Sequence, residues 1–445
     1  MTANNYFSFK NIWKIGYPII LGSLAQDIIT VVDTAFIGRL GESELGGAAI
    51  GGIFYLAIVM IGWGFGLGVQ IIIARRYGEN DIQAINKILY HSLIVLLILA
   101  STVFFIIHNF DNHIFNSIIK SPNIKHESLK FINIRIFGLF AAFVNINFRA
   151  FYIGTANTKI ISYTTILMAI VNITLDYLLI FGNGIFPKMD IEGAALASVI
   201  SEYCALLFFI VFSLLSKKTK VFNLFKINKI DFTVIKNIMK TSTPTMLQNF
   251  ISLSAWFIFF VFVEKMGETP LAISNIIRSS YIIMLVPIFG FASATNTLIS
   301  YSIGNNTPEN IYPIIKKSLL MAMGGVGFFV IIGILFPHQI IGFYTNIGSI
   351  IELTIPVFYM VMASAFSIAF GLIMFQAVSG TGNTVTSLFI EIFVIGMYLL
   401  GVYLISESES PSILLVWSME FCYGLGLGII SFIYLKSGKW KSKNI

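Results

Sequence analysis

The sequence is poor in charge. Asp, Glu, Lys and Arg make up 11% of its 445 residues, whereas a soluble domain carries about 25%. Such a chain cannot cover a water-facing surface, and its mean hydropathy of +0.86 agrees. Apolar stretches of about 20 residues recur along it, each long enough to cross about 30 Å of hydrocarbon as a helix. Because these runs are continuous and do not alternate, they exclude a barrel and predict an all-α polytopic membrane protein.

Cysteine is almost absent as well. Cys204 and Cys422 both lie in apolar stretches, where a free thiol behaves as a small hydrophobe. No Cys/His metal spacing exists, and no nucleophile is paired with a base, so we expect neither a cofactor nor an enzyme. The first residues, MTANNYFSFKNIWK, have no short apolar core before a cleavage site, so no cleavable signal peptide is expected.

Twelve spans are predicted from the apolar runs, near residues 13–37, 45–74, 88–108, 130–152, 160–182, 191–215, 238–263, 272–302, 314–336, 351–378, 385–405 and 412–435. Lysine and arginine concentrate on one side of them, above all in the loop of residues 216–240. The positive-inside rule therefore places this loop and both termini in the cytoplasm. Topology and anionic headgroups account for the net charge of +7, so no nucleic-acid partner is expected.

The two halves of the chain repeat each other in one fixed register. When Pro18 is aligned with Pro244, Gly64-Phe65 meets Gly290-Phe291, and GTANT at 154–158 meets GTGNT at 380–384. This repeat register predicts a six-helix lobe over 1–215, a basic cytoplasmic linker over 216–240 and a second six-helix lobe over 241–445. An even number of spans per lobe predicts a pseudo-two-fold axis along the membrane normal, with substrate bound between the lobes.

Several carboxylates fall within the predicted spans, where a charge costs about 2.5–3.5 kcal/mol and indicates function by default. These are Asp33, Asp176, Glu202, Glu391 and Glu420, with Asp27 nearer the start of its span. Asp27 and Asp33 are six residues apart, so they do not share a helix face and at most one points into a common pocket.

Asn172 and Asp176 lie four residues apart, one turn from each other on one helix face. An amide oxygen and a carboxylate can both ligate Na⁺; alternatively, the amide can orient a carboxylate that exchanges a proton. Ser198 and Glu202 have the same spacing and can extend the polar cluster. The plainer alternative is that these polar groups only join helices.

The repeats differ in their charges. In the repeat register Asp33 corresponds to Phe259 and Asp176 to Val402, so the aspartates are not retained as a matched pair and the first lobe is the chemically special one. In the second lobe, Glu391 and Arg278 can form a substrate-facing pair, although Arg278 can equally extend toward the membrane surface. Gln248 is a further polar residue that can line the cavity there.

The chain resembles the multidrug and toxic compound extrusion (MATE) family over nearly its whole length. The motifs that carry the resemblance are VDTAFIGRLG at 32–41, IARRYGEND at 73–81, GTANTK at 154–159, NITLDYLLIFG at 172–182, EGAALASVIS at 192–201 and GTGNT at 380–384. The resemblance implies twelve helices in two lobes and antiport of organic compounds, drug-like or cationic, against inward H⁺ or Na⁺. It also implies a multi-pass monomer in the bacterial cytoplasmic (inner) membrane, with lipid and a small-molecule substrate as its partners.

The resemblance assigns roles to particular residues. Asp33 matches the family's first-helix aspartate, Asn172 and Asp176 match the fifth-helix pair of the DinF-like branch, and Ser198 falls where that branch often has threonine. In the family these residues form the cation site, so Asp33, Asn172 and Asp176 are the expected ligands if the ion is Na⁺.

Two expectations remain open at this point. The glutamate and aspartate that the NorM-like branch places in its seventh and tenth helices are missing here, which favours the DinF-like branch. The alternative function is a lipid-linked oligosaccharide flippase of the same superfamily, although such proteins often have more helices and a more cationic cavity.

Overall fold

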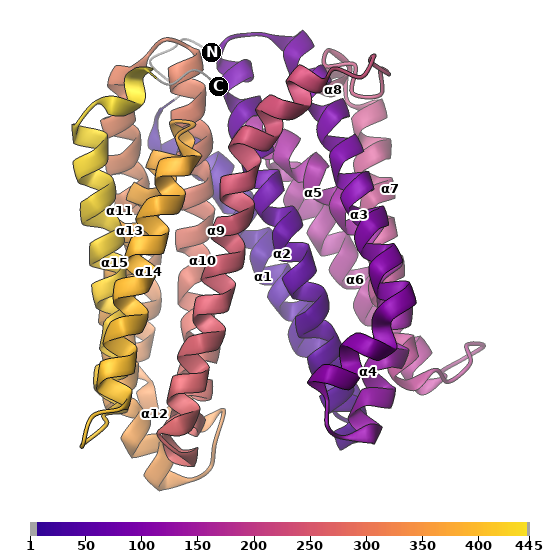
Figure 1. Ribbon diagram of the computed structural model, residues 1–445, viewed down its shortest axis with the longest axis vertical. Coiled ribbons are helices and arrows are strands. Elements are labelled where there is room, and N and C mark those ends of the chain that lie inside the picture. The colour runs from indigo at the N-terminus through magenta and orange to yellow at the C-terminus, as the bar shows by residue number, and fades with distance from the viewer. Residues whose placement is uncertain (1–6, 443–445) are drawn as a thin grey trace. The chain divides into compact units, whose positions relative to one another are not determined.

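The computed structural model describes residues 7–442, and these form helices joined by short loops, without a strand (Figure 1). The chain divides into two compact units. The N-terminal unit is Leu21–Ser242, and the C-terminal unit contains the chain from Thr243 onward together with the residues that precede Leu21. The predicted lobes, 1–215 and 241–445, stay a prediction about the transport unit. The segment 216–242 groups with the N-terminal unit.

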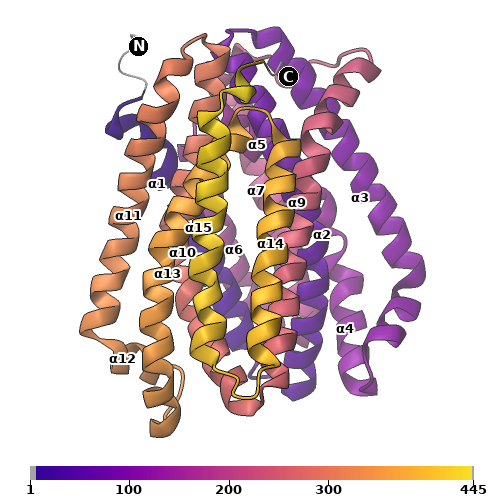
Figure 2. The same cartoon turned by 60° about the vertical axis from the view of Figure 1, so that its left-hand side comes forward.

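The helices of the first half of the chain are α1 (Phe9–Ile37), α2 (Glu42–Gly78), α3 (Ile82–Ile118), α4 (Pro122–Arg135), α5 (Gly138–Gly154), α6 (Lys159–Phe181), α7 (Asp190–Leu215) and the short α8 (Lys217–Lys220). The second half contains α9 (Phe232–Lys265), α10 (Glu268–Gly304), η2 (Pro308–Asn310), α11 (Ile311–Leu335), α12 (Pro337–Gly342), α13 (Gly348–Gly380), α14 (Thr384–Ser406), α15 (Ile413–Lys436) and η3 (Lys439–Ser442). In the C-terminal unit, α13 packs against both α10 and α15 (Figure 2).

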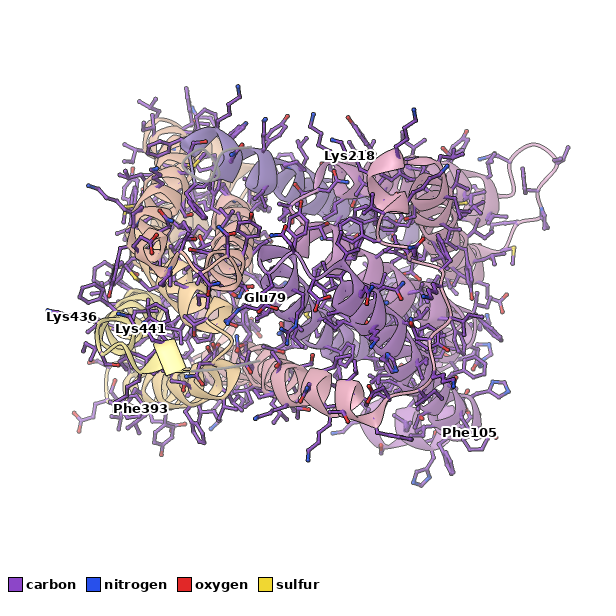
Figure 3. The ribbon with its side chains drawn as sticks, turned by 90° about the horizontal axis from the view of Figure 1, so that it is seen from above. Glu79, Phe105, Lys218, Phe393, Lys436 and Lys441 are labelled. Atoms are coloured by element: carbon purple, nitrogen blue, oxygen red, sulfur yellow. The ribbon has the colours of Figure 1, made fainter. Side chains whose placement is uncertain are left out.

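Eleven of these helices are long and apolar enough to cross a membrane, and the bent pair α4–α5 supplies a twelfth span. The twelve predicted spans are thereby confirmed: eleven coincide with one helix each to within a few residues, and the fourth extends across the bent pair α4–α5. Large apolar side chains cover the outside of each unit, as lipid contact requires. Phe105 on α3 and Phe393 on α14, 65% and 61% exposed, point outward at the margins of their own units (Figure 3).

The helix bounds follow the repeat. The repeat register, which aligns Pro18 with Pro244, brings α2 onto α10, and the segment from the start of α4 to the end of α5 onto α13. The difference lies inside that last pair: α13 is one helix, whereas its counterpart breaks at Ile136 and Phe137 and bends by 53°. The fourth predicted span, 130–152, is therefore two helices rather than one.

Two helices begin in one unit and end in the other. The start of α1 packs with α10, where a Cβ on Gly16 would lie 2.8 Å from the Phe291 ring. The start of α9 packs with α2, where a Cβ on Gly68 would collide with Ser242. Each helix carries a proline, Pro18 or Pro244, close to the point where it passes from one unit to the other. Proline removes a backbone hydrogen bond, so both helices are weakened there.

The linker is fastened to α3. The amide Nδ2 of Asn86 donates to the carbonyl of Asn223 at 2.5 Å. The His91 ring accepts from the backbone N–H of Asp231 through Nε2 at 2.9 Å. Its Nδ1 lies 2.7 Å from the Lys87 carbonyl, and since a carbonyl oxygen can only accept, Nδ1 is the donor of this bond. Helix α9 already begins at Phe232, so the end of the predicted linker is helical.

Candidate functional site

The packing of α1 against α6 brings Asp33 and Asp176 together. A Cβ on Gly22 would lie 3.3 Å from Thr165 Oγ1, and Ile37 packs with Ile180 in one apolar cluster. Asp33 and Asp176 lie between these two contacts, one turn before Ile37 and Ile180. Two parallel helices in one register therefore hold the carboxylates against each other.

Three of the four oxygens of the two carboxylates are buried without a donor among the described residues. Asp176 is fully buried, and neither of its oxygens accepts a hydrogen bond from a described residue. The Oδ1 atom of Asp33 is buried and also without a donor, and the two carboxyl groups interact directly with each other. Two ionised carboxylates can only accept, so a proton held between them, or a small cation, would satisfy both.

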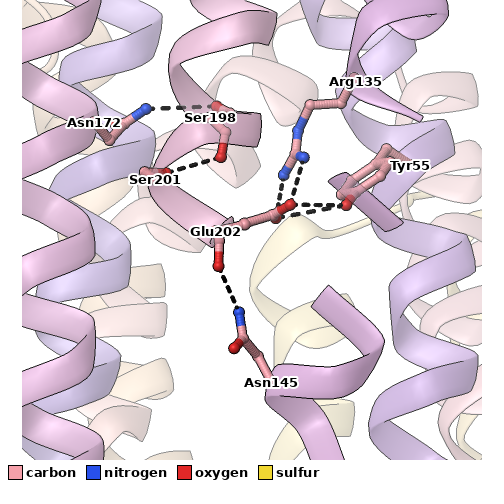
Figure 4. A network of polar contacts seen from close by, with 7 residues as sticks. All are labelled: Tyr55, Arg135, Asn145, Asn172, Ser198, Ser201 and Glu202. Carbon is pink, nitrogen blue, oxygen red and sulfur yellow. Dashed lines mark hydrogen bonds and ion pairs between the residues drawn. The ribbon is translucent and has the colours of Figure 1, made fainter. Parts of the chain in front are cut away.

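Asn172 adds an oxygen to this pair. It is fully buried one turn before Asp176, and its Oδ1 has no donor among the described residues. Its Nδ2 reaches toward Ser198 Oγ on α7 at 3.5 Å, a long contact (Figure 4). Asp33, Asp176 and Asn172 thus offer acceptor oxygens of the kind a hard cation such as Na⁺ prefers. No cluster of three or more His, Cys, Asp or Glu side chains suited to a metal occurs within residues 7–442.

An ion pair on the other side of Ser198 was not predicted. Arg135, the last residue of α4, donates from Nη1 and Nη2 to the Glu202 carboxylate at 2.9 and 2.5 Å. Its guanidinium also lies 3.8 Å from the centre of the Tyr55 ring, and the Tyr55 hydroxyl approaches the same carboxylate at 3.3 Å (Figure 4). The sequence contained a sign of this pair, because Arg135 falls within a predicted span.

The C-terminal unit has two buried glutamates that bind hydroxyl groups. Glu391 accepts from Ser252 Oγ at 2.7 Å and from the Tyr423 hydroxyl at 3.1 Å. Glu420 accepts from the Tyr398 and Tyr281 hydroxyls at 2.8 and 3.2 Å. Hydroxyl donors satisfy part of each carboxylate, so these groups differ from Asp176, whose oxygens have no donor.

The remaining predicted residues are scattered. Asp27 is half-buried on α1. Gln248 is buried, with its Oε1 lacking a donor. Arg278 is exposed and lies over the Phe260 ring, 5.1 Å from its centre. The described contacts of Glu391 are hydroxyl groups and do not include Arg278, and a substrate-facing role for the two residues stays a prediction.

The fold and this buried polar site define a class of protein, a duplicated helical membrane transporter. The MatE family model matches residues 18–178 and 244–404, once in each repeat. The chain belongs to the MatE family.

Relatives in the family have about a quarter of their residues in common with this chain. A protein of Thermotoga maritima named "Probable multidrug resistance protein NorM" is 23% identical over 98% of this chain and 94% of its own. The "Probable multidrug resistance protein YoeA" of Bacillus subtilis is 24% identical over 74% of this chain and 71% of its own.

Solved structures have the same fold. The crystal structure of a MATE protein in complex with MaL6 gives a TM-score of 0.90 at 20% identity and covers both chains completely. An outward-facing MATE transporter gives a TM-score of 0.89 at 20% identity, over 100% of this chain and 99% of its own. At this identity the likeness concerns the fold, which is the twelve-helix fold of these transporters.

Proposed function

We propose that the protein exports small organic, drug-like or cationic compounds across the membrane and couples export to inward movement of H⁺ or Na⁺. Family membership makes it a transporter and not an enzyme, and its relatives are named as multidrug resistance proteins. The observation that carries the coupling is the acidic pair Asp33 and Asp176, whose buried oxygens have no donor within residues 7–442.

The coupling step follows from this lack of donors. A buried carboxylate without partners is destabilised when ionised, because nothing replaces the water it has lost. Binding a proton or Na⁺ at Asp33, Asp176 and Asn172 removes that penalty and lets the unit repack. In alternating access, the ion would bind from outside, drive release of the substrate outward, and leave to the cytoplasm. An electrical potential of about 100 mV supplies roughly 2.3 kcal/mol per charge moved.

The position of the site favours the DinF-like branch. The coupling residues lie in the N-terminal unit, and α9 has Ser252 rather than an acidic residue beside Glu391. A lipid-linked oligosaccharide flippase is less well supported, since the candidate site is acidic and the relatives are named for multidrug resistance.

The proposal also covers the location, the orientation in the membrane and the partners of the transporter. We place it as a monomer in a bacterial inner membrane, with the basic segment around α8 and both termini in the cytoplasm. Its partners are lipid and a small-molecule substrate; nucleic acid and a cofactor play no part.

The test is efflux of the fluorescent cation ethidium from proteoliposomes under an imposed pH gradient, and separately under an imposed Na⁺ gradient. The wild type should respond to one gradient, and the Asp33→Asn/Asp176→Asn variant should lose that response while still reaching the membrane. Asp27→Asn, the same change at a half-buried position on the same helix, should retain it. Full gradient-driven transport by the double variant would refute the proposal.

A further inference from the structure

Arg149 is a cation inside a membrane span, and it has no counter-charge among the described residues. It lies on α5, and its guanidinium forms neither an ion pair nor a hydrogen bond with another residue of the described chain. Its Nε atom is buried without an acceptor. Arg135 at the end of α4 differs, because the Glu202 carboxylate accepts from it at 2.9 and 2.5 Å. An unpaired charge within a span indicates function by default.

The guanidinium of Arg149 lies over the ring of Trp63. Its Cζ atom is 4.7 Å from the ring centre on α2. Glycines hold the two helices close at this level: a Cβ on Gly62 would lie 2.7 Å from the Phe143 ring, and one on Gly66 would lie 2.5 Å from Ile146. An aromatic face attracts a positive charge but supplies no oxygen acceptor for the N–H groups. The described residues therefore leave the hydrogen-bonding capacity of Arg149 unused.

A second unpartnered atom belongs to Asn145, one turn before Arg149 on the same face of α5. Asn145 is 9% exposed; its Nδ2 donates to the Glu202 carbonyl at 3.0 Å, but its Oδ1 is buried without a donor in the described chain (Figure 4). Helical side chains tilt toward the N-terminus of their helix, which carries the head of Arg149 back toward this level. An unused donor and an unused acceptor thus lie on one helix face.

The second repeat lacks this polar pair. In the repeat register the corresponding residues are Phe289 for Trp63, Phe375 for Arg149 and Gly371 for Asn145. Phe289 and Trp63 are similarly exposed, at 49% and 43%, whereas Phe375 is 1% exposed. The exposed aromatic position is common to both repeats, and the arginine is not. Since an apolar side chain fills the equivalent position in the same fold, packing alone does not call for an arginine.

We propose that Arg149, Asn145 and Trp63 form a binding site for an aromatic acid. The carboxylate pairs with the guanidinium, an arrangement that is strong because it is charge-assisted and bidentate. An N–H group beside the carboxylate donates to Asn145 Oδ1, and the aromatic body of the ligand packs on the exposed part of Trp63. The three residues belong to one unit. The site extends the proposed substrate class from cations to organic acids, and calling the acid a substrate rests on the proposed export function.

The probes are dansylglycine and dansylglycinamide. They have the same aromatic ring and sulfonamide N–H and differ in the carboxylate. Binding is followed as the rise in dansyl fluorescence when the purified full chain in dodecyl maltoside is titrated without an ion gradient. The wild type should bind the acid about 10–100-fold more tightly than the amide, since the amide loses the charge-assisted pair. Equal affinities would overturn the inference, and this comparison needs no variant.

Three variants locate the preference. Arg149→Gln should weaken dansylglycine binding by about 10–100-fold, to the level of the amide; it leaves no described carboxylate unpaired, so the chain should still fold. Arg149→Lys keeps the charge but loses the planar fork, and its affinity for the acid should be intermediate. Trp63→Leu should weaken both probes alike, by about 2–10-fold, because both have the ring. A Trp63→Leu effect on the acid alone would contradict the assigned packing.

Arg39→Gln is the matched control. Arg39 is exposed in the same unit, and the substitution removes the same charge from the chain. The ratio of the two affinities should stay at the wild-type value. A fall in this ratio as large as that in Arg149→Gln would mean that the overall charge attracts the acid, and the site would be refuted.

A phospholipid phosphate presents the same oxyanion chemistry to Arg149 as a carboxylate does. The titration is therefore repeated in nanodiscs of phosphatidylcholine, with and without phosphatidylglycerol. Phosphatidylglycerol should change the affinity for dansylglycine equally in the wild type and in Arg149→Gln. If it weakens binding to the wild type more, lipid occupies the site and the assignment to a small-molecule acid is overturned.

Transport in proteoliposomes separates this inference from the function on which it rests. If ethidium efflux ignores both ion gradients, the proposed function fails, and the titration still decides whether the acid site exists. If ethidium efflux is driven by a gradient, the ratio of dansylglycine to ethidium transport should fall at least about tenfold in Arg149→Gln. An unchanged ratio would refute the acid as a substrate and leave the proposed function in place.

Discussion

Replacing Asp176 by Asn should stabilise the protein. The carboxylate is fully buried, and neither of its oxygens has a donor in the described part of the chain. An unsatisfied buried polar group costs about 1–3 kcal/mol. The asparagine amide can donate to the buried Oδ1 of Asp33, which also lacks a donor. One new hydrogen bond between two unsatisfied groups should therefore raise the free energy of unfolding by about 1–3 kcal/mol.

The assay is thermal unfolding of the detergent-solubilised protein. A unit of 150–250 residues shifts its Tm by about 2–4 °C per kcal/mol, so we expect a rise of about 2–12 °C. Asp27→Asn, the same change at a half-buried position, should stay within about 0.5 kcal/mol of the wild type. A fall in the Tm of Asp176→Asn would mean that the carboxylate makes a stabilising contact, and the argument that its burial serves function would be lost.

Two further changes test the packing of α7 against α6 and the hydrogen bond at the start of α9. Gly193→Ala on α7 would place a Cβ 2.8 Å from the backbone carbonyl of Leu179 on α6, so overpacking should cost about 1–3 kcal/mol and lower the Tm, whereas Gly396→Ala, with nothing within 4 Å, should not lower it. The exposed Asp231 accepts from the Thr233 N–H at 2.9 Å, and this backbone bond lowers the pKa of its carboxyl. Its stabilisation of the start of α9 is therefore present above the unfolded-state pKa of about 3.9 and lost as the pH falls through the lower folded value. Hydrogen exchange of the Thr233 amide should accelerate there relative to Asp231→Asn, and equal exchange in both proteins would contradict the assignment.

The fold was predictable because lipid offers no hydrogen-bond partners to the backbone, which restricts the structures that can span a membrane. Apolar runs must be helices, and the repeat register that aligned Gly64-Phe65 with Gly290-Phe291 also aligns α2 with α10 end to end. The cost of burying a charge singled out Asp33 and Asp176, and the resemblance to the MATE family is what placed them in one site. The role assigned to that site stays a prediction until transport is measured.

The break between α4 and α5 was not predictable from local preference. Its residues, Ile136 and Phe137, are ordinary in a membrane helix, and Gly138 alone does not end one. Residues at the bend, Arg135 and Phe137, form hydrogen bonds with partners far along the chain, Glu202 and Tyr203. The clearest sign in the sequence was Arg135 itself, a charge inside a span that called for a partner.

The partners of the C-terminal glutamates could not be inferred either. Opposite charge suggested Arg278 for Glu391, yet the carboxylate binds Ser252 and Tyr423. Tyrosines are common throughout the chain, so a helical spacing cannot say which of them donate to Glu420. Such contacts depend on how three helices face one another. The spacing of residues within one helix does not give this information.

The exchange of helix starts between the units has a consequence for biosynthesis. The N-terminal unit ends at Ser242, so it can complete its packing while the rest of the chain is still being made. The start of α1 packs against Phe291. At about 5–20 residues per second, Phe291 leaves the ribosome roughly 15–55 s after the start of α1 does. A chain that stops after the linker would leave this first segment without its partner helix.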